Sequence, residues 1–271
     1  MATFVQRLRS YYHRRIDIPV GATALVLDVG SGDKPHWRAD VLLDRYLTEA
    51  HGVQRSGSSS VSITHPMFDA DAADMPFADH VFDFVVCSHM LEHVTDPAAV
   101  IGELMRVAKA GYIEVPEAAS AKIVDFPSHL WWCELVDGVL VFTAKSQPFF
   151  DADIDAYLTN SGLREPLAKM LDADLDHRVV SLRWTGTIPF EVRGTLDSAF
   201  ANAAMEAEAH HRGGQALASR CLTAATRLAY RRRLRTAPVR FDDVVKPDRR
   251  CNDDERLSAR IYDCVSSRRA P

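Results

Sequence analysis

A glycine-rich turn and an acidic residue lie at spacings that suit the binding of a nucleotide-like ligand. Gly30-Ser31-Gly32 follows the apolar run at residues 24–29, and Asp44 ends a second apolar run at residues 41–43. Glycine has no Cβ and tolerates positive φ, so a ligand can approach the backbone of such a turn closely. A carboxylate after the second strand can accept hydrogen bonds from two ribose hydroxyls. Because Asp is also a common turn residue, Asp44 alone leaves both interpretations open.

The glycine turn does not carry the complete dinucleotide fingerprint. In the pattern G-x-G-x-x-G, the third glycine would fall at position 35, which is Pro35. The pattern therefore argues against NAD, although an NAD-binding Rossmann-like protein stays an alternative.

Strands and helices alternate along the first half of the chain. Continuous apolar runs predict buried parallel strands, and Asp96-Pro97 supplies an N-cap and an N1 proline for a helix that Gly111 ends. This order predicts an α/β fold with a doubly wound, mostly parallel sheet. Two later pairs of segments predict antiparallel hairpins at its edge. The expected strands are residues 24–29, 41–43, 82–87, 112–115, 129–135, 139–144, 177–183 and 187–192.

The third strand leads into a pattern that also occurs in zinc peptidases. His89, Glu92 and His93 match H-x-x-E-H, in which two histidines on one face of a long helix bind zinc. Here a buried strand ends at Cys87 and Pro97 begins the next helix, which leaves room for a short turn only. A zinc hydrolase is therefore a remote alternative, because the motif lacks its structural context.

Four motifs together resemble the methyltransferase type 11 family of class I S-adenosylmethionine-dependent methyltransferases. The resemblance implies a Rossmann-like, seven-stranded, doubly wound sheet with an antiparallel edge, and S-adenosyl-L-methionine as cofactor. It also implies a cofactor site along the first four strands. The motifs are Leu27-Asp28-Val29-Gly30-Ser31-Gly32, Asp44, Asp71-Ala72-Ala73-Asp74-Met75-Pro76-Phe77, and residues 82–94 from Phe82 to Val94.

The resemblance assigns a contact to each part of the cofactor. The segment Asp28, Val29, Gly30, Ser31 and Gly32 would hold its amino acid end, and Asp44 would hold its ribose. The adenine would contact Asp71 and Ala72, while Ser88 and His89 would border the methyl donor and the acceptor. Only residues 33–40 separate the turn from the second strand, which is fewer than the roughly 10 to 12 residues of a helical crossover, so a stunted first helix is expected.

His93 and His129 are the candidate general bases. The resemblance implies methyl transfer to a small-molecule or saccharide acceptor, and transfer to a hydroxyl oxygen benefits from an imidazole that accepts the proton. Each histidine could instead be a hydrogen-bonded structural residue. Trp131-Trp132 could line the acceptor pocket or simply pack in the hairpin. A protein that binds the cofactor without catalysing is a further alternative.

No structural metal is expected. Of the ligands that a zinc-ribbon tail would need, only Cys251 and Cys264 are present in the terminal segment. The five cysteines are scattered and form no C-x-x-C pair, so reduced thiols are expected.

The composition argues against nucleic-acid binding, membrane spanning and secretion. The net charge of -5 gives no global basic field for nucleic acid. No apolar run reaches about 18 residues and no secretory signal is visible, so a cytoplasmic protein is expected. The pattern predicts an N-terminal helix in residues 1–20, a cofactor-binding domain in 21–200 and a basic helical extension in 201–271. The basic helix near Arg227 to Arg235 could contact a membrane surface or be an ordinary solvated helix.

Overall fold

The computed structural model describes residues 4–45, 47, 60–206, 213–250 and 255–264. Its centre is a seven-stranded sheet in the order β10-β3-β2-β1-β4-β5-β8. All neighbouring strands are parallel except β8, which is antiparallel to β5 at one edge. The predicted doubly wound sheet with an antiparallel edge is confirmed. The strands are β1 Val26–Val29, β2 Val41–Asp44, β3 Met67–Asp69, β4 Phe84–Ser88, β5 Ala110–Pro116, β8 Val179–Thr185 and β10 Ile261–Asp263.

A second, three-stranded sheet is formed by β6 (Trp131–Val136), β7 (Val139–Ala144) and β9 (Phe190–Arg193). The predicted hairpin of β6 and β7 is confirmed, but it does not extend the main sheet. The predicted hairpin of residues 177–183 with 187–192 is wrong, because β8 pairs with β5 along its whole length while β9 pairs in parallel with β7. Pro189 begins the second pairing by accepting a hydrogen bond from the Leu140 N–H.

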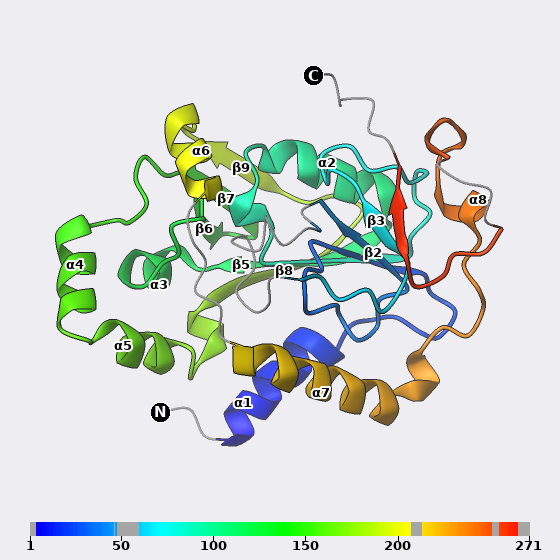
Figure 1. The fold of residues 1–271 in the computed structure, drawn as a ribbon, viewed down its shortest axis with the longest axis horizontal. Helices are drawn as coiled ribbons and strands as arrows, with labels where there is room; N and C mark the ends of the chain where they lie inside the picture. Colours follow the sequence, from blue (N-terminus) through cyan, green and yellow to red (C-terminus); the bar gives the residue numbers. More distant parts are fainter. Residues whose placement is uncertain (1–3, 46, 48–59, 207–212, 251–254, 265–271) are drawn as a thin grey trace.

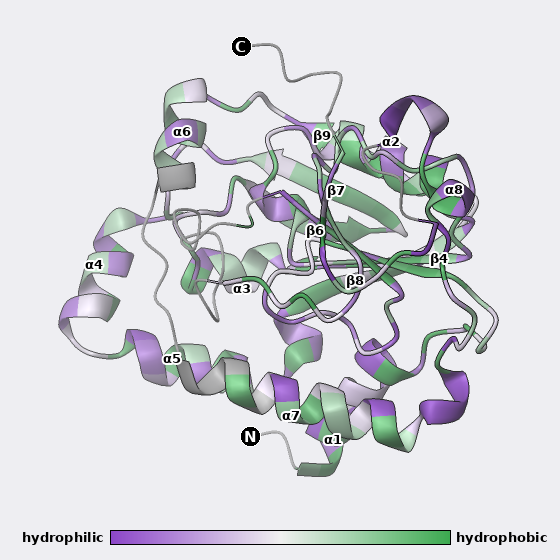
Figure 2. Ribbon diagram, turned by 45° about the vertical axis from the view of Figure 1, so that its right-hand side comes forward, coloured by the Kyte–Doolittle hydropathy of each residue, from purple (hydrophilic) through white to green (hydrophobic). Residues whose placement is uncertain are grey.

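Helices cover both faces of the main sheet (Figure 1). Helix α2 and the small sheet share the larger apolar core with one face, while α1 and α7 lie toward the opposite face. Green apolar strands run through the interior in Figure 2, between helices of mixed hydropathy. The helices are α1 Phe4–Tyr11, α2 Pro97–Val107, α3 Ala118–Ile123, α4 Ala152–Asn160, α5 Arg164–Leu171, α6 Ser198–Glu206, α7 Gly213–Ala229 and α8 Phe241–Val244.

Local sequence accounts for α2 and for its connection to β5. The Asp96 side chain accepts a hydrogen bond from the Ala99 N–H at 2.9 Å, and Pro97 occupies the first helical turn, as predicted. Gly111 lies within β5 rather than at the end of α2. A Cβ there would lie 2.7 Å from the carbonyl oxygen of Val85 and from Nε1 of Trp184, so only glycine fits between these strands.

The first crossover contains no helix at all. Residues 33–40 are turns and irregular structure. A shortened first helix was predicted here, but no helix is present in these residues. The eleven residues 30–40 connect β1 to β2 without a helix, and side chains replace helical hydrogen bonds in holding them. Asp28 accepts from the His36 N–H at 2.7 Å, and Asp40 accepts from the Val26 N–H at 2.9 Å.

Both ends of the chain differ from the prediction. The N-terminal helix is short, since α1 ends at Tyr11 and a π-helical turn follows at Tyr12–Ile16. Segment 201–271 is not a purely helical extension. Its strand β10 completes the main sheet beside β3, with Tyr262 stacked on Phe68 at 5.2 Å between ring centroids. A boundary at residue 200 therefore divides a single sheet.

Candidate active site

A cavity of about 1440 Å³ opens at the carboxyl ends of β1, β2 and β4. One end is lined by the glycine turn, Asp44 and Asp71, and the other by Glu92, His93 and His129 together with α4 and α5. In an open α/β sheet, ligands bind at this edge. The cavity thus contains all the predicted cofactor residues except Val29, which is buried in the core, and both predicted catalytic histidines.

The glycine turn has the backbone that the sequence predicts. Gly30 and Gly32 have φ of 72° and 51°, in the left-handed region that favours glycine. A Cβ on Gly30 would lie 2.5 Å from Cγ of Met90, so a side chain at position 30 would collide with the segment after β4.

Two polar atoms beside the turn have no hydrogen-bond partner among the described residues. They are Oγ of Ser31 and Oδ2 of Asp33, and both are buried. A hydroxyl can donate to a carboxylate, and a carboxylate can accept from an ammonium group. These atoms therefore fit the amino acid end of S-adenosylmethionine. Asp33 was not predicted, because only its unpartnered burial distinguishes it from other turn aspartates.

Asp44 is held at the end of β2 by the turn that it faces. Its Oδ2 accepts from the Gly32 N–H at 2.9 Å, and its Oδ1 accepts from the Arg45 N–H at 2.8 Å. Each carboxylate oxygen can accept about two hydrogen bonds, as contact with two ribose hydroxyls would require. Arg45 also pairs with Asp71 at 2.6 Å, and this bridge links the predicted ribose and adenine contacts.

Asp28 and His36 form a buried pair beneath the turn. Burial raises the pKa of Asp28 to about 6, although the hydrogen bond from the His36 N–H lowers it in part. Burial lowers the pKa of His36 to about 3. The His36 ring lies between the Arg15 carbonyl, 3.1 Å from Nε2, and the Arg38 N–H, 3.2 Å from Nδ1. The neutral imidazole suits this position, because it can donate to the first and accept from the second.

Ser88 and His89 converge on a carboxylate that the sequence did not single out. Glu114 is fully buried in β5, and its Oε1 accepts from Oγ of Ser88 and pairs with Nε2 of His89, both at 3.1 Å. Tyr112 and Arg14 bind the same carboxylate at 2.5 Å. Burial would raise the pKa of Glu114, but His89, Arg15 and Arg14 hold it well below its usual value. Burial would lower the pKa of His89, yet its two glutamate neighbours raise it to about 9.

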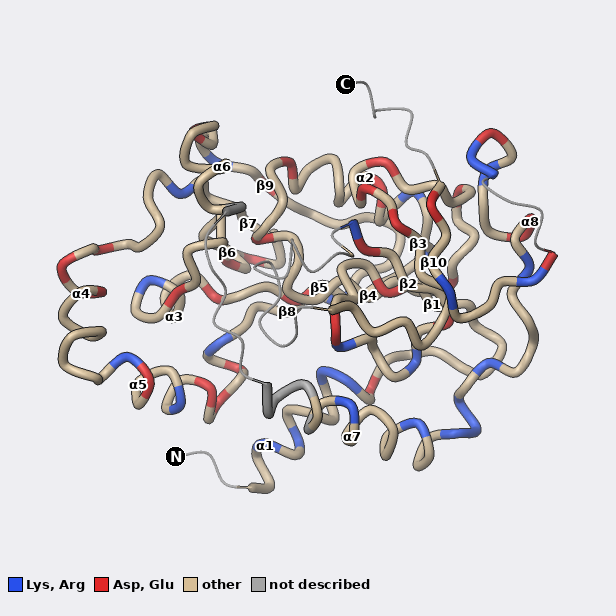
Figure 3. The backbone as a smooth tube through the Cα atoms, viewed as in Figure 1, with Lys and Arg blue, Asp and Glu red and all other residues tan. Residues whose placement is uncertain are grey.

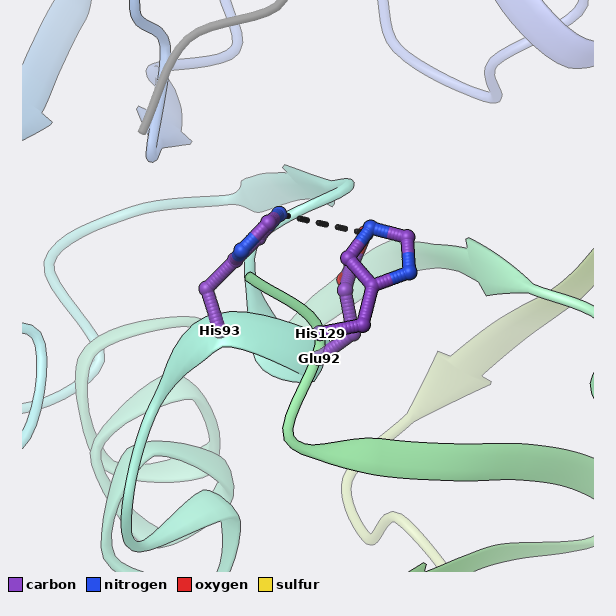
Figure 4. Close-up of side chains that lie close together, drawn as sticks. All are labelled: Glu92, His93 and His129. Carbon is purple, nitrogen blue, oxygen red and sulfur yellow. Dashed lines mark ion pairs between the residues drawn. The ribbon is translucent and has the colours of Figure 1, made fainter. Parts of the chain in front are cut away.

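His93 and His129 face each other across the far end of the cavity (Figure 4). Their ring centroids are 4.8 Å apart. Nδ1 of His93 lies 3.1 Å from the Ser128 carbonyl oxygen, and Nδ1 of His129 lies 2.7 Å from Oδ1 of Asp125. Both Nδ1 atoms therefore act as donors, which leaves the Nε2 atoms as acceptors directed toward each other and Glu92. Burial lowers the pKa of His93 to about 4.

The tryptophan pair packs rather than lining the cavity. Trp131 is buried and donates from Nε1 to the Val94 carbonyl at 2.8 Å. Trp132 lies under the ammonium group of Lys145, 4.4 Å from the ring centroid. Neither ring lines the cavity, so packing in the hairpin is the correct alternative of the two.

The H-x-x-E-H segment does not have the geometry of a peptidase helix. Residues Leu91–His93 form one 3-10 turn, and His89 precedes it with a φ of 55°. The ring of His89 pairs with Glu114 through Nε2 at 3.1 Å and with Glu92 through Nδ1 at 3.3 Å. The expected short turn is confirmed. Of the proposed zinc-ribbon pair, Cys264 is buried at the end of β10, while Cys251 lies outside the described residues.

The basic segment after α7 is largely tied to the N-terminal part of the chain. Figure 3 shows Lys and Arg along α7 and the chain that follows it. Arg227 donates to the Trp37 carbonyl at 2.7 Å, Arg233 to the Ile16 carbonyl at 3.0 Å, and Arg235 to the Thr23 carbonyl. Three arginines of the predicted membrane-contact segment are thus engaged within the protein. Among the helices that the structure describes, none combines the length and apolar character needed to span a bilayer.

Comparison with known proteins identifies a domain in the first half of the chain. The family model described as a methyltransferase domain, type 11, matches residues 27–113. Residues 27–113 are a methyltransferase domain. The domain includes every predicted cofactor residue, and the family implies S-adenosylmethionine as methyl donor. His129, α4 and α5 lie beyond it.

One curated relative is the demethylmenaquinone methyltransferase of Corynebacterium urealyticum. It is 34% identical to this chain over 106 residues, which are 38% of this chain and 44% of the relative. The chain thus matches less than half the length of that enzyme.

Solved structures match more distantly. A candidate methyltransferase of Bacillus halodurans is 20% identical, over 53% of this chain and 64% of its own, with a TM-score of 0.31. The [4+2]-cyclase SpnF is 18% identical, over 68% of this chain and 82% of its own, with a TM-score of 0.35.

Proposed function

We propose that the protein is an S-adenosylmethionine-dependent methyltransferase that methylates a hydroxyl oxygen of a small, hydroxyl-rich acceptor such as a saccharide. The observation that carries this proposal is the continuity of the cavity, which joins the methyltransferase-domain residues Gly30 and Asp44 to the acceptor-facing His93 and His129. A donor at one end and an acceptor at the other would therefore meet within one cavity.

The cofactor contacts follow from the geometry of the near end. Ser31 and Asp33 would bind the carboxylate and ammonium groups of the methionine part, and Asp44 would accept hydrogen bonds from the ribose. Asp71 and Ala72 would contact the adenine. When bound, S-adenosylmethionine supplies an electrophilic methyl group next to Ser88 and His89.

The far end suits a polar acceptor. Charged and hydroxyl side chains line it beside the apolar rings of Phe126 and Phe149, and the polar groups can bind several hydroxyls at once. His129 would accept the acceptor proton at Nε2, because Asp125 holds Nδ1 as a donor. His93 would position the acceptor from the opposite side. The polar lining includes Asp155, Thr159, Arg164, Asp172 and Arg178.

Calorimetry with the full chain tests the cofactor part of this proposal. S-adenosylhomocysteine should bind with one site per chain, while NAD should give no measurable heat at the same concentrations. Tight NAD binding without S-adenosylhomocysteine binding would overturn the assignment. Radiolabelled methyl transfer to a panel of sugars and phenols tests the acceptor part, and transfer only to amines or thiols would contradict oxygen methylation. S-adenosylhomocysteine binding with no transfer to any acceptor class would favour the non-catalytic alternative.

A further inference from the structure

Glu92 is a buried carboxylate without a hydrogen-bond partner. Its side chain is fully buried, and neither Oε1 nor Oε2 has a hydrogen bond among the described residues. The neighbouring imidazole nitrogens are Nδ1 of His89 at 3.3 Å from Oε1 and Nε2 of His93 at 3.9 Å. A buried carboxylate is costly unless cations or donors accompany it, and Glu92 has only the cation of His89, which it shares with Glu114. No hydrogen bond or ion pair with a described residue reaches Oε2, so the position can accept a further cation.

Two histidines next to Glu92 are already oriented as metal ligands. Metal-binding histidines usually donate their second ring N–H to a carboxylate or a backbone carbonyl, which fixes the ring and its tautomer. His129 does so to Asp125 at 2.7 Å, and Nδ1 of His93 lies 3.1 Å from the Ser128 carbonyl oxygen. Asp125 is itself fixed by Lys145 at 2.5 Å. Each Nε2 is thus presented to the space beside Glu92.

The three ligand atoms are close enough to share one ion. One carboxylate oxygen of Glu92 and one ring nitrogen each of His93 and His129 all lie within 4.8 Å of one another. Ligands about 2.1 Å from zinc stand roughly 3.4 Å apart in a tetrahedron, so shifts on the order of 1 Å complete the site. The backbone already connects its two parts, because the Leu130 N–H donates to the Glu92 carbonyl at 2.7 Å.

We propose that Glu92, His93 and His129 bind a divalent transition-metal ion such as Zn²⁺, with its remaining coordination position open to the cavity. Two imidazoles and one carboxylate with an open position form a ligand set typical of catalytic zinc. This set differs from the H-x-x-E-H pattern, because His129 from a distant loop replaces His89. The sequence-based expectation of no metal considered only His89, His93 and the cysteines, and it could not anticipate His129.

The open position also defines a class of acceptor. With the ion bound, Nε2 of His129 is a ligand and is no longer the proton acceptor. A hydroxyl oxygen bound to the ion loses its proton more readily than in water, so the ion takes over this role. Acceptors with a hydroxyl that can reach the ion, especially vicinal diols or phenols, would therefore be preferred. This consequence rests on the proposed methyltransferase function, whereas the metal site itself does not.

Zinc titration of the chelator-treated full chain tests the site. Calorimetry with ZnCl₂ should show one ion per chain, and His129→Ala and Glu92→Gln should each weaken binding by about 100-fold or more. His177→Ala removes an exposed histidine and should leave the affinity unchanged. His89→Ala should retain one ion per chain. No specific binding by the wild type, or equal binding by wild type, His129→Ala and Glu92→Gln, would overturn the proposal.

Two further measurements distinguish loss of the metal site from unfolding of a variant and from failure of the proposed methyltransferase function. Binding of S-adenosylhomocysteine by a variant shows that the variant is folded. A variant that loses zinc binding but still binds S-adenosylhomocysteine has therefore lost the metal site alone. Zinc-loaded wild type should show two imidazole ligands by X-ray absorption, and a spectrum dominated by sulfur or by oxygen alone would contradict the assignment. Zinc binding without S-adenosylhomocysteine binding would instead count against the proposed function.

Discussion

The two ends of the cavity are built by different means. The cofactor end consists of strand ends and a tight turn, all inside residues 27–113, where the sheet topology itself brings Gly30, Asp44 and Asp71 together. The acceptor end combines Glu92 and His93 of this domain with a loop at residues 125–129 and helices α4 and α5, which lie outside it. Arg164 of α5 donates a hydrogen bond to the Asp125 carbonyl of the loop at 2.8 Å. The methyl donor has one chemical structure, so a single arrangement of strand ends can bind it. The segments after β5 do not have to bind the donor and can therefore suit a different ligand, the acceptor.

The largest effect is expected from Asp44 at the cofactor end. Asp44→Ala should weaken S-adenosylhomocysteine binding by about 1 to 3 kcal/mol, because ribose hydroxyls lose a charged acceptor. Calorimetry measures the change, and Asp153→Ala, in the exposed first turn of α4, is the matched control. Unchanged affinity in a folded Asp44→Ala protein would remove Asp44 from the cofactor site.

His36 should make the cofactor end sensitive to acid. The folded pKa of about 3 lies below the ordinary value of 6.5, so the unfolded chain binds the proton more tightly. Stability from this group is complete above pH 6.5 and is lost as the pH falls toward 3. Between pH 7 and pH 5 the loss should be about 2 kcal/mol.

Urea unfolding of wild type and His36→Gln at both pH values isolates this contribution from those of other histidines. Glutamine keeps a donor for the Arg15 carbonyl and does not titrate in this range. Equal pH dependence in the two proteins would show that His36 does not remain neutral on folding.

Substitution of a residue at the acceptor end should lower turnover without changing cofactor affinity. His129→Ala should leave S-adenosylhomocysteine affinity within about threefold and lower turnover by more than about tenfold, which is 1.4 kcal/mol or more of transition-state stabilisation. Steady-state kinetics with an identified acceptor provides the measurement. A collapse of cofactor affinity in the folded variant would contradict the division of the cavity into two ends.

The smallest effect is expected from the packed tryptophan. Trp131→Phe removes the hydrogen bond to the Val94 carbonyl but keeps most of the ring volume, so the free energy of unfolding should fall by about 1 kcal/mol. Cofactor affinity should not change, because the ring does not line the cavity. Thermal unfolding with and without S-adenosylhomocysteine tests both statements, and a change in ligand-induced stabilisation would place Trp131 closer to the ligand than the structure does.

Prediction from sequence succeeded where local chemistry decides the structure. The apolar runs of β1, β2, β4 and β5, the Gly30 turn and the cap at Asp96 are each specified by neighbouring residues, and all are present. The H-x-x-E-H turn was short for the same reason, because a strand and a proline confine it.

Prediction from sequence failed where contacts between segments far apart in the sequence determine the structure. Nothing near β9 indicates that it pairs with β7 instead of β8, because its pattern suits either partner. Asp33 and Glu92 differ from other acidic residues only in being buried without partners, and that burial depends on the whole fold. Glu114 likewise becomes central only when Arg14, about a hundred positions earlier, reaches it.

The position of β10 in the sequence means that β3 is synthesised long before the strand that covers its edge. Strand β10 pairs with β3 from a position about 190 residues later, and translation at roughly 5 to 20 residues per second would separate the two strands by on the order of 10 to 40 s. During that interval the nascent chain has an open edge at β3, with Phe68 uncovered on one side. An open edge of this kind is a template for unwanted pairing with other chains. Yield in the cell should therefore depend on how well chaperones shield β3 until the last strand emerges.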